Sequence, residues 1–432
     1  MRNLINCLLL FLFAANFYSC SKDYTDVDDT SGCYVFTLTS DDDSILQGDT
    51  YLFFFDDDNN LVTYCNYDYV DDYRQFLSLD SGSYTVLALT NAEADLVALI
   101  LSGEMTLQEI LELLGDYDLD TMGYGVLAVI VDALANNQIT IDVVADIEEL
   151  DFSALSLAIS YPVDSIPEYT RSGDSSLRLR TTIELQQGGS SVFRGSWFLD
   201  EQDADLNYLK SIYLSEGDYD LVLWADYVSD LDTDYHYDTS NLSNVSVLSS
   251  SLYTANSDYR DAFVMYTSVT VSKDDTSAKL IETYRPAAKY SIVSTDVEKY
   301  NESRVENGYA EISDLDIEVT YNGYFPSAYS VTTGKLTNAL TGYGYSSAVS
   351  SYDDESATIA KDFVMVANGN ESSVSLSIVV KNTDGEIINE FNSITVAYKS
   401  GYHTTVTGNF LTQSNGGFVL EQEWDGEFNV TF

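Results

Sequence analysis

Residues 79–91, LDSGSYTVLALTN, contain a pattern that recurs at residues 214–227 as LSEGDYDLVLWADY. Both stretches read L-x-x-G-x-Y and continue into an apolar run, and a looser copy, KSGYHTTVTGNF, occupies residues 399–410. The glycine suits the turn before a strand, and the tyrosine begins an alternating strand face. One copy in each expected domain predicts three β-sandwiches of related topology.

Short alternating segments surround the first copy. CYVFTLT (33–39), TYLFFFD (50–56) and NLVTYC (60–65) are rich in β-branched and aromatic residues and are bounded by turn-forming residues. The run DDDNN between the last two segments predicts a hairpin turn. GVLAVIV (125–131) fits a strand or a buried helix, because so short an apolar run has no deciding periodicity.

One predicted helix interrupts the strands. TLQEILELL begins at Thr106, and Glu109 follows three residues later at the spacing of a capping box. Leu107, Ile110 and Leu114 recur at helical spacing and form an apolar stripe. We therefore expect one short helix in the first domain, packed on one end of its sandwich.

The expected domain boundaries follow from a break in the strand pattern. The segment YPVDSIPEYTRSGDSS (161–176) contains proline, serine and glycine and reads as a linker. Strands resume at LRLRTTIEL and continue to the chain end. We therefore expect a first sandwich over residues 33–163, a linker over 164–176, a second sandwich over 177–284 and a third over 285–432.

The N-terminal segment has the features of an export signal. An apolar stretch from Leu4 to Phe13 is too short to span a bilayer and precedes FYSC, which ends at Cys20. This order predicts a lipoprotein signal peptide over residues 1–19, acylation of Cys20, and an acidic tether over residues 20–32. An ordinary secretory signal with a chance cysteine is the alternative.

The charge of the chain excludes some partners. The chain has 70 acidic and 19 basic residues, a formal net charge of −51, and 45% hydrophobic residues. That hydrophobic fraction is typical of a folded protein. The negative charge argues against binding to nucleic acid, which requires Lys and Arg, and against electrostatic adsorption to anionic lipid. The lipid on Cys20 is then the expected attachment to the outer membrane.

Two cysteines remain in the expected mature chain. Cys7 is lost with the signal and Cys20 is acylated, which leaves Cys33 and Cys65 on predicted strands of the first domain. An oxidising compartment permits a disulfide between them. The spacing leaves a bridge and two buried free thiols both open.

The sequence lacks the motifs of common catalytic sites. It has two histidines, far apart, and no GxSxG, HExxH or Walker A string. Asp56, Asp58 and Asn60 have the spacing of a calcium loop, but Leu61 stands where that loop needs glycine, so a hairpin turn fits better. We expect no enzyme activity, no cofactor and no metal site.

Tyrosine-rich loops are the candidate adhesive surface. Tyr235 and Tyr237 lie in DYVSDLDTDYHYD (226–238), and Tyr343 and Tyr345 lie in TGYGYSSAVSSYDD (341–354). Tyrosine offers a large contact area at low entropy cost, and the neighbouring Ser, Gly and Asp offer polar contacts. Solvated loops without a ligand are the alternative.

Several segments resemble a known protein family. YLFFFDDDNNLV with LDSGSYTVLALTN is similar to the minor, anchor-type fimbrial subunits of Bacteroidales. RPAAKYSIVSTDV, TYNGYFPSAYSVTTGKL and EWDGEFNVTF, within residues 176–432, resemble a related fimbrillin-like lipoprotein family of Bacteroides. The resemblance covers nearly the whole expected mature chain, and its motifs are structural rather than catalytic.

The resemblance implies an all-β fold of tandem transthyretin-like Greek-key sandwiches with surface display and strand donation between subunits. It also implies other fimbrial subunits as partners, with host or bacterial surface ligands as further candidates. The alternating C-terminal segment EFNVTF makes Phe428, Val430 and Phe432 a candidate donor strand, or else the last strand of its own domain. A glycan-binding surface lipoprotein that does not polymerise is the alternative function.

Proteolytic opening of an acceptor groove, which occurs in shaft subunits of that family, has no site near the first strand here. There is no Lys or Arg between Lys22 and Arg74, and cutting at Arg74 would remove three predicted strands. Cutting at Arg171 would release the first domain with its lipid. An anchor or accessory subunit is therefore expected rather than a shaft subunit.

Overall fold

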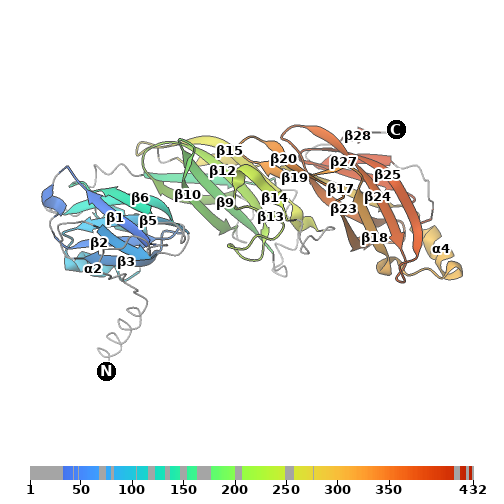
Figure 1. Cartoon of the computed structure of the whole chain (residues 1–432), viewed down its shortest axis with the longest axis horizontal. Helices are drawn as coiled ribbons and strands as arrows, with labels where there is room; N and C mark the ends of the chain where they lie inside the picture. Colours follow the sequence, from blue (N-terminus) through green and yellow to red (C-terminus); the bar gives the residue numbers. More distant parts are fainter. Residues whose placement is uncertain are drawn as a thin grey trace, which may run out of the picture.

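Three β-rich bodies follow one another along the long axis of the molecule, in the order of the sequence (Figure 1). The computed structural model describes residues 33–41, 43–46, 48–67, 74–78, 82–103, 105–114, 122–131, 137–145, 153–162, 177–199, 207–248, 257–275, 277–412, 419–424 and 428–430. The predicted all-β class is confirmed. Each body is a sandwich of two sheets with an apolar core between them.

The first sandwich has a three-stranded and a four-stranded sheet, ordered β4-β1-β7 and β3-β2-β5-β6. Its strands are β1 (Cys33–Thr39), β2 (Thr50–Phe55), β3 (Leu61–Tyr67), β4 (Arg74–Ser78), β5 (Gly82–Thr90), β6 (Gly123–Val131) and β7 (Asn137–Asp142). The core contains Phe36 from β1, Phe54 from β2 and Val86 from β5. The segment GVLAVIV is thus part of a strand.

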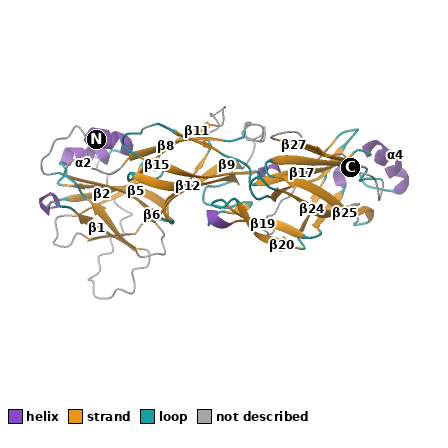
Figure 2. Ribbon diagram, turned by 90° about the horizontal axis from the view of Figure 1, so that it is seen from above, coloured by secondary structure: helices purple, strands orange, loops and turns teal. Residues whose placement is uncertain are grey.

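The four-stranded sheet of the first sandwich is buried on both faces. Phe53 and Leu87 point away from the first core and pack against α2 (Ala94–Ile100) and α3 (Leu107–Leu114). Figure 2 shows α2 on one side of β2 and β1 on the other. The sequence predicted one helix packed on an end of the sandwich, whereas α2 and α3 both cover a face of the four-stranded sheet.

The capping box of α3 is confirmed. The backbone N–H of Thr106 donates to Glu109 Oε2 at 2.8 Å, and the backbone N–H of Glu109 donates to Thr106 Oγ1 at 3.4 Å. No capping motif in the sequence marks the start of α2, and its N-cap residue, Glu93, makes no side-chain capping bond.

The hairpin between β2 and β3 is also confirmed. The two strands are antiparallel, and Asp56 Oδ1 accepts hydrogen bonds from the backbone N–H groups of Asp58 and Asn60 at 3.0 and 2.8 Å. Asn59 occupies the left-handed region with φ of 63°, which an asparagine tolerates. The aspartate at the start of DDDNN thus holds the turn through its side chain.

The second sandwich repeats the arrangement of the first. Its strands are β8 (Ser153–Ser160), β9 (Arg178–Gln187), β10 (Ser190–Phe198), β11 (Asn207–Leu214), β12 (Gly217–Val228), β15 (Ala262–Val271) and β16 (Lys279–Glu282). Its sheets are ordered β11-β8-β16 and β10-β9-β12-β15. The strands β5 and β12, which carry the two close copies of the sequence pattern, occupy the same place in their sheets.

The position of β8 differs from the expected boundary. The sequence pattern predicts that residues up to 163 belong to the first sandwich. In the structure β8 pairs antiparallel with β11 and parallel with β16, and Leu155, Leu157 and Ile159 lie in the second core. The strand belongs to the second sandwich because its partners lie later in the chain. The proposed linker, residues 164–176, lies outside the described residues.

The third sandwich contains strands β17 (Ala287–Ser294), β18 (Asp316–Tyr321), β21 (Gly344–Ala348), β22 (Ser351–Tyr352), β23 (Ala357–Met365), β24 (Glu371–Lys381), β25 (Ile387–Lys399), β26 (Tyr402–Gly408), β27 (Val419–Trp424) and β28 (Phe428–Val430). Its sheets are ordered β21-β18-β24-β25 and β22-β23-β17-β26-β27-β28. The helix α4 (Val297–Asn307) lies at its outer end (Figure 1).

One topology unites the three bodies. In each, the first strand pairs antiparallel with the strand β4, β11 or β23 and parallel with β7, β16 or β26. The related topology predicted from the sequence is therefore confirmed. The looser third copy of the pattern falls on β26, however, whereas the strand that corresponds to β5 and β12 is β24.

A further sheet, in addition to the two of each sandwich, joins the second and third sandwiches. It consists of β13 (Tyr237–Asp238), β14 (Val245–Val247), β19 (Tyr324–Ser330) and β20 (Lys335–Thr341). Alternate residues of β12 face different cores: Leu223 belongs to the second core, while Trp224 belongs to the cluster that continues into the third sandwich. The strand β12 is thus buried on both faces.

Buried ion pairs reinforce the same junction. Arg260, in the 3₁₀ turn η8 (Asp258–Arg260), contacts Asp362 of β23 through its Nη1, and both side chains are almost fully buried. The hydroxyl of Tyr321 donates to Asp362 Oδ2 at 2.8 Å. Because Arg260 precedes β15 of the second sandwich, this pair ties the two sandwiches together.

Candidate functional site

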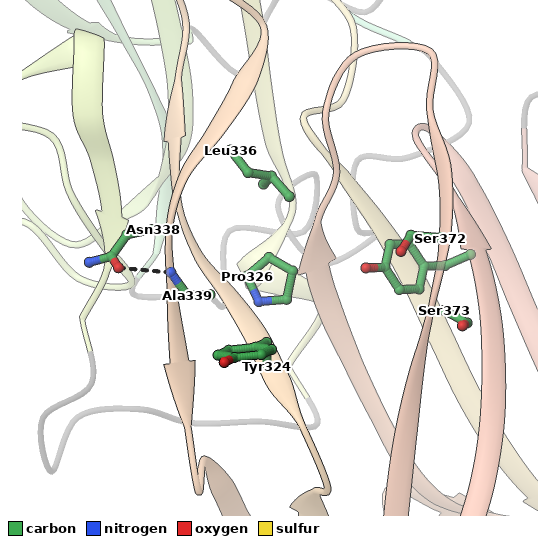
Figure 3. Close-up of a pocket in the computed structure, with 8 residues that line it drawn as sticks. Tyr324, Pro326, Leu336, Asn338, Ala339, Ser372 and Ser373 are labelled. Atoms are coloured by element: carbon green, nitrogen blue, oxygen red, sulfur yellow. Dashed lines mark hydrogen bonds between the residues drawn. The ribbon is translucent and has the colours of Figure 1, made fainter.

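A cleft opens on the third body between the hairpin β19–β20 and the strand pair β24–β25. Its volume is about 460 Å³, and Figure 3 shows the residues that line it. Tyr324 and Pro326 come from β19, Leu336 from β20, and Ser372 and Ser373 from β24. None of the lining residues is charged, although the chain as a whole is strongly acidic.

The hairpin positions an aromatic ring at the rim of this cleft. Tyr324 is the first residue of β19 and is 76% exposed, whereas the next residue, Phe325, is buried and stacks on Tyr343 with ring centroids 4.2 Å apart. Successive side chains of a strand point to opposite faces. Phe325 therefore anchors the strand in the core and directs Tyr324 outward.

The hairpin departs from a regular ladder near Pro326. The register of β19 and β20 shifts on both sides of Ala328, and Pro326 has no N–H to contribute to a ladder. The backbone N–H of Ala339, opposite Pro326, donates to Asn338 Oδ1 at 2.8 Å (Figure 3). The turn between the strands uses Gly334 at φ of 64°, which favours glycine.

Hydroxyl groups lie across the cleft from the Tyr324 side. Ser372 and Ser373 are exposed at the beginning of β24, and Ser372 lies directly opposite Tyr398 in the register of β24 and β25. Burial raises the pKa of the Tyr398 hydroxyl above its usual value, so the group is neutral and can donate a hydrogen bond. Tyr398 itself is 5% exposed and lies in the third core, so the cleft combines one exposed ring with exposed serines and one nearly buried phenol.

The four tyrosines expected to form an adhesive surface lie elsewhere, and all four are partly or fully buried. Tyr237 is 2% exposed, and its hydroxyl donates to the backbone carbonyl of Arg260, so it does not belong to a surface and the expectation is corrected. Tyr343 and Tyr345 are half-buried against the third core, and the Tyr345 hydroxyl lies 3.0 Å from that of Tyr290. Tyr235 is half-buried against the second core.

The C-terminal candidate donor strand is described in part. Residues Phe428–Val430 form β28, which pairs antiparallel with β27 at the edge of the six-stranded sheet. Phe432 lies outside the described residues, as do the lipidation candidate Cys20 and the candidate cleavage residue Arg171. The placement of β28 at an edge is compatible with a last strand of its own domain.

The thiol of Cys65 is buried in the core of the first sandwich. Burial raises the pKa of this thiol to about 12. Cys33 lies on β1, in the opposite sheet, but its side chain is outside the described side chains. The bridge between the two cysteines therefore stays a prediction.

Thiol counting is expected to decide between the two states of these cysteines. In the mature chain carrying Cys20→Ser, Cys65 should not react with Ellman's reagent at pH 8, because only about 1 in 10⁴ of such thiols is ionised. In urea without reductant we expect two reactive thiols, and one in the Cys33→Ser variant. No reactive thiol in urea would instead establish the bridge.

The profile of a family described as "Family of unknown function (DUF6562)" matches residues 149–432. The chain belongs to this family. The match begins just before β8, the first strand of the second sandwich, and runs through the third. A search of curated proteins finds no match.

Solved structures with a loosely similar arrangement come from Bacteroides, Porphyromonas and Parabacteroides species. A DUF1812 protein from Bacteroides thetaiotaomicron has a TM-score of 0.38 and 13% identity over 65% of this chain and 98% of that chain. The fimbrial anchor protein Mfa2 from Porphyromonas gingivalis has a TM-score of 0.31 and 9% identity over 64% and 100%. A fimbrial assembly protein from Parabacteroides distasonis has a TM-score of 0.33 and 9% identity over 63% and 97%.

Proposed function

We propose that this DUF6562 protein is a cell-surface lipoprotein of the fimbrillin class, a structural anchor, tip or accessory subunit that assembles by donating or accepting a β-strand. The observation that carries the proposal is the tandem repetition of one sandwich topology three times in a row. Such a row makes an elongated body with a sheet edge on every unit, which suits display and assembly better than catalysis.

The place of β1 supports an anchor or accessory role over a shaft role. The strand lies between β4 and β7 and pairs with both, so its loss would leave two strands without their shared partner. The chain has no Lys or Arg between Lys22 and Arg74 at which a trypsin-like protease could release it. A subunit that keeps its first strand also keeps the N-terminal segment attached to the body.

The proposed membrane attachment is a lipid on Cys20. Among the helices in the described part of the chain, none has the length and apolar character needed to cross a membrane. The apolar segment before Cys20 is short and is followed by Ala14 and Ala15, as export signals often are, although Phe17 and Tyr18 stand where lipoprotein signals usually carry leucine and a small residue. Outer-membrane display with other fimbrial subunits as partners follows from this attachment as part of the proposal.

Radiolabelled palmitate tests the proposed attachment in cells that produce the protein. We expect label in the wild-type chain, none in Cys20→Ser, and loss of surface exposure to added protease in that variant. N-terminal sequencing of the surface protein should find a blocked cysteine. A mature chain that starts after Arg171, or a product found in the cytosol, would contradict the proposal.

Deletion of residues 428–432 tests strand donation in the same cells. A donor strand predicts a stable monomer that no longer enters high-molecular-weight complexes or filaments seen by electron microscopy. A deletion that instead unfolds the third sandwich, measured by circular dichroism of the purified chain, would assign β28 to its own domain and contradict donation from this end.

A further inference from the structure

We propose that the cleft between β19–β20 and β24–β25 binds neutral carbohydrate, with the Tyr324 ring as the surface on which a sugar ring stacks. The inference rests on the proposed function only for access, because a surface protein can meet a glycan in the medium. Binding itself is a property of the purified chain.

The Tyr324 side chain is highly exposed to solvent. Its side chain is 76% exposed, compared with 40% for Tyr266 and 55% for Tyr352, the other tyrosines among the exposed large hydrophobic residues. Its ring lies at a hollow lined further by Pro326 and Leu336, and Leu336 is itself 39% exposed. Exposed apolar groups that gather at a concave site indicate a binding function more often than single exposed residues do.

The uncharged polar residues on the opposite side of the cleft favour a carbohydrate ligand. A pyranose has one apolar face of C–H groups and a rim of hydroxyls, so it needs a flat ring beside uncharged hydrogen-bonding groups. Tyr324 supplies the ring, and Ser372, together with the hydroxyl of the nearly buried Tyr398 opposite it, supplies uncharged groups that can both donate and accept. A volume of about 460 Å³ lies within the range of about 300–1,000 Å³ typical of small-ligand sites, which suits a short oligosaccharide.

The uncharged lining of the cleft and the negative charge of the chain disfavour anionic glycans as ligands. None of the residues that line the cleft is charged, so a carboxylate or sulfate on the ligand would find no cation there. The chain carries a formal net charge of −51, which repels anionic polysaccharides at long range. Sialylated and sulfated glycans are therefore disfavoured, and neutral sugars remain.

The hairpin edge argues against a peptide strand as the occupant. An added strand pairs with a regular row of backbone donors and acceptors. On β20 the side chain of Asn338 accepts from the backbone N–H of Ala339, and the register shifts near this point. Both features blunt the edge, as natural edge strands often are.

The test is glycan binding by the full mature chain carrying Cys20→Ser, purified without lipid. Isothermal titration would use maltoheptaose, mannopentaose, xylohexaose and lacto-N-tetraose as neutral probes, with 3′-sialyllactose as the charged comparator. We expect binding of at least one neutral probe and weaker or no binding of the sialylated one. Lack of binding to every neutral probe, or preference for the sialylated probe, would overturn the proposal.

Substitutions test whether the carbohydrate binds in this cleft. Tyr324→Ala should weaken binding about tenfold or more, which corresponds to about 1.4 kcal/mol. Tyr324→Phe should retain it, and Ser372→Ala with Ser373→Ala should weaken it several-fold. Tyr352→Ala removes another exposed tyrosine on the same sandwich and should leave affinity unchanged. Equal affinity of wild type and Tyr324→Ala would overturn the proposal.

Light scattering tests whether a second copy of the chain, rather than a carbohydrate, occupies the cleft. If light scattering finds a dimer that Tyr324→Ala dissociates, the cleft is an interface between copies and the carbohydrate proposal is overturned. Failure of glycan binding leaves the palmitate result unaffected, and absence of palmitate labelling leaves binding by the purified chain unaffected. The two proposals can therefore fail separately.

Discussion

Asp362→Ala is expected to lower the free energy of unfolding by about 3–5 kcal/mol, because it leaves Arg260 as a buried charge without its carboxylate. Asp362 and Arg260 are each 1% exposed, and they are in direct contact. The substitution also removes the acceptor for the hydroxyl of Tyr321, which lies 2.8 Å from Asp362 Oδ2. Urea unfolding followed by circular dichroism measures the loss.

Two further variants separate the charge from the packing at this position. Asp354→Ala removes an exposed carboxylate from a turn in the same sandwich and should change the free energy of unfolding by less than about 0.5 kcal/mol. The double variant Arg260→Met with Asp362→Leu removes both charges and should recover most of the loss. A double variant as unstable as Asp362→Ala would contradict the assigned cause.

The same pair accounts for the relative placement of the second and third sandwiches. Arg260 precedes β15 and Asp362 lies on β23, which pairs with β17. A second pair, Arg285 with Asp261, lies at the same junction, with Nε and Oδ2 3.0 Å apart. Ion pairs with both members buried fix one geometry, because any other geometry leaves a charge without a partner.

Local patterns in the sequence predicted the elements whose cause is local. The capping box at Thr106, the hairpin at DDDNN and the alternating strands depend on residues within a few positions of each other. Strand β8 is an element that local sequence patterns assign to the wrong sandwich. Its residues alternate like any other strand, but its partners β11 and β16 lie about 50 and 120 residues later, so only tertiary pairing assigns it to the second sandwich.

The candidate site was harder to predict than the fold for a related reason. Tyrosine content alone favoured Tyr237, but that ring fills the core beside Trp224, with ring centroids 5.2 Å apart. Tyr324 lies in TYNGYFPSAYS, where the turn residues Asn322 and Gly323 and the nearby proline indicate a hairpin start. Which of Tyr324 and Phe325 faces outward follows from the core that Phe325 enters, and that core is not visible in the local sequence.

Trp224→Ala is the second substitution with a large expected effect, about 3–5 kcal/mol of unfolding free energy. The side chain is 0% exposed and packs edge-on against Tyr237 in the cluster that continues into the third sandwich. Its removal leaves a cavity at the junction rather than inside one sandwich. Differential scanning calorimetry should therefore show a lower melting temperature and a separation of the two sandwiches into distinct transitions.

Leu223→Ala is the matched control for the location of that cavity. Leu223 precedes Trp224 on β12, is also 0% exposed, and belongs to the second core. Its truncation should cost about 2–5 kcal/mol but leave the coupling between the sandwiches intact, because the contacts across the junction are unchanged. Tyr266→Ala, at an exposed position on the neighbouring strand β15, should cost less than either. If Leu223→Ala separated the transitions and Trp224→Ala did not, the two faces of β12 would be assigned to the wrong cores.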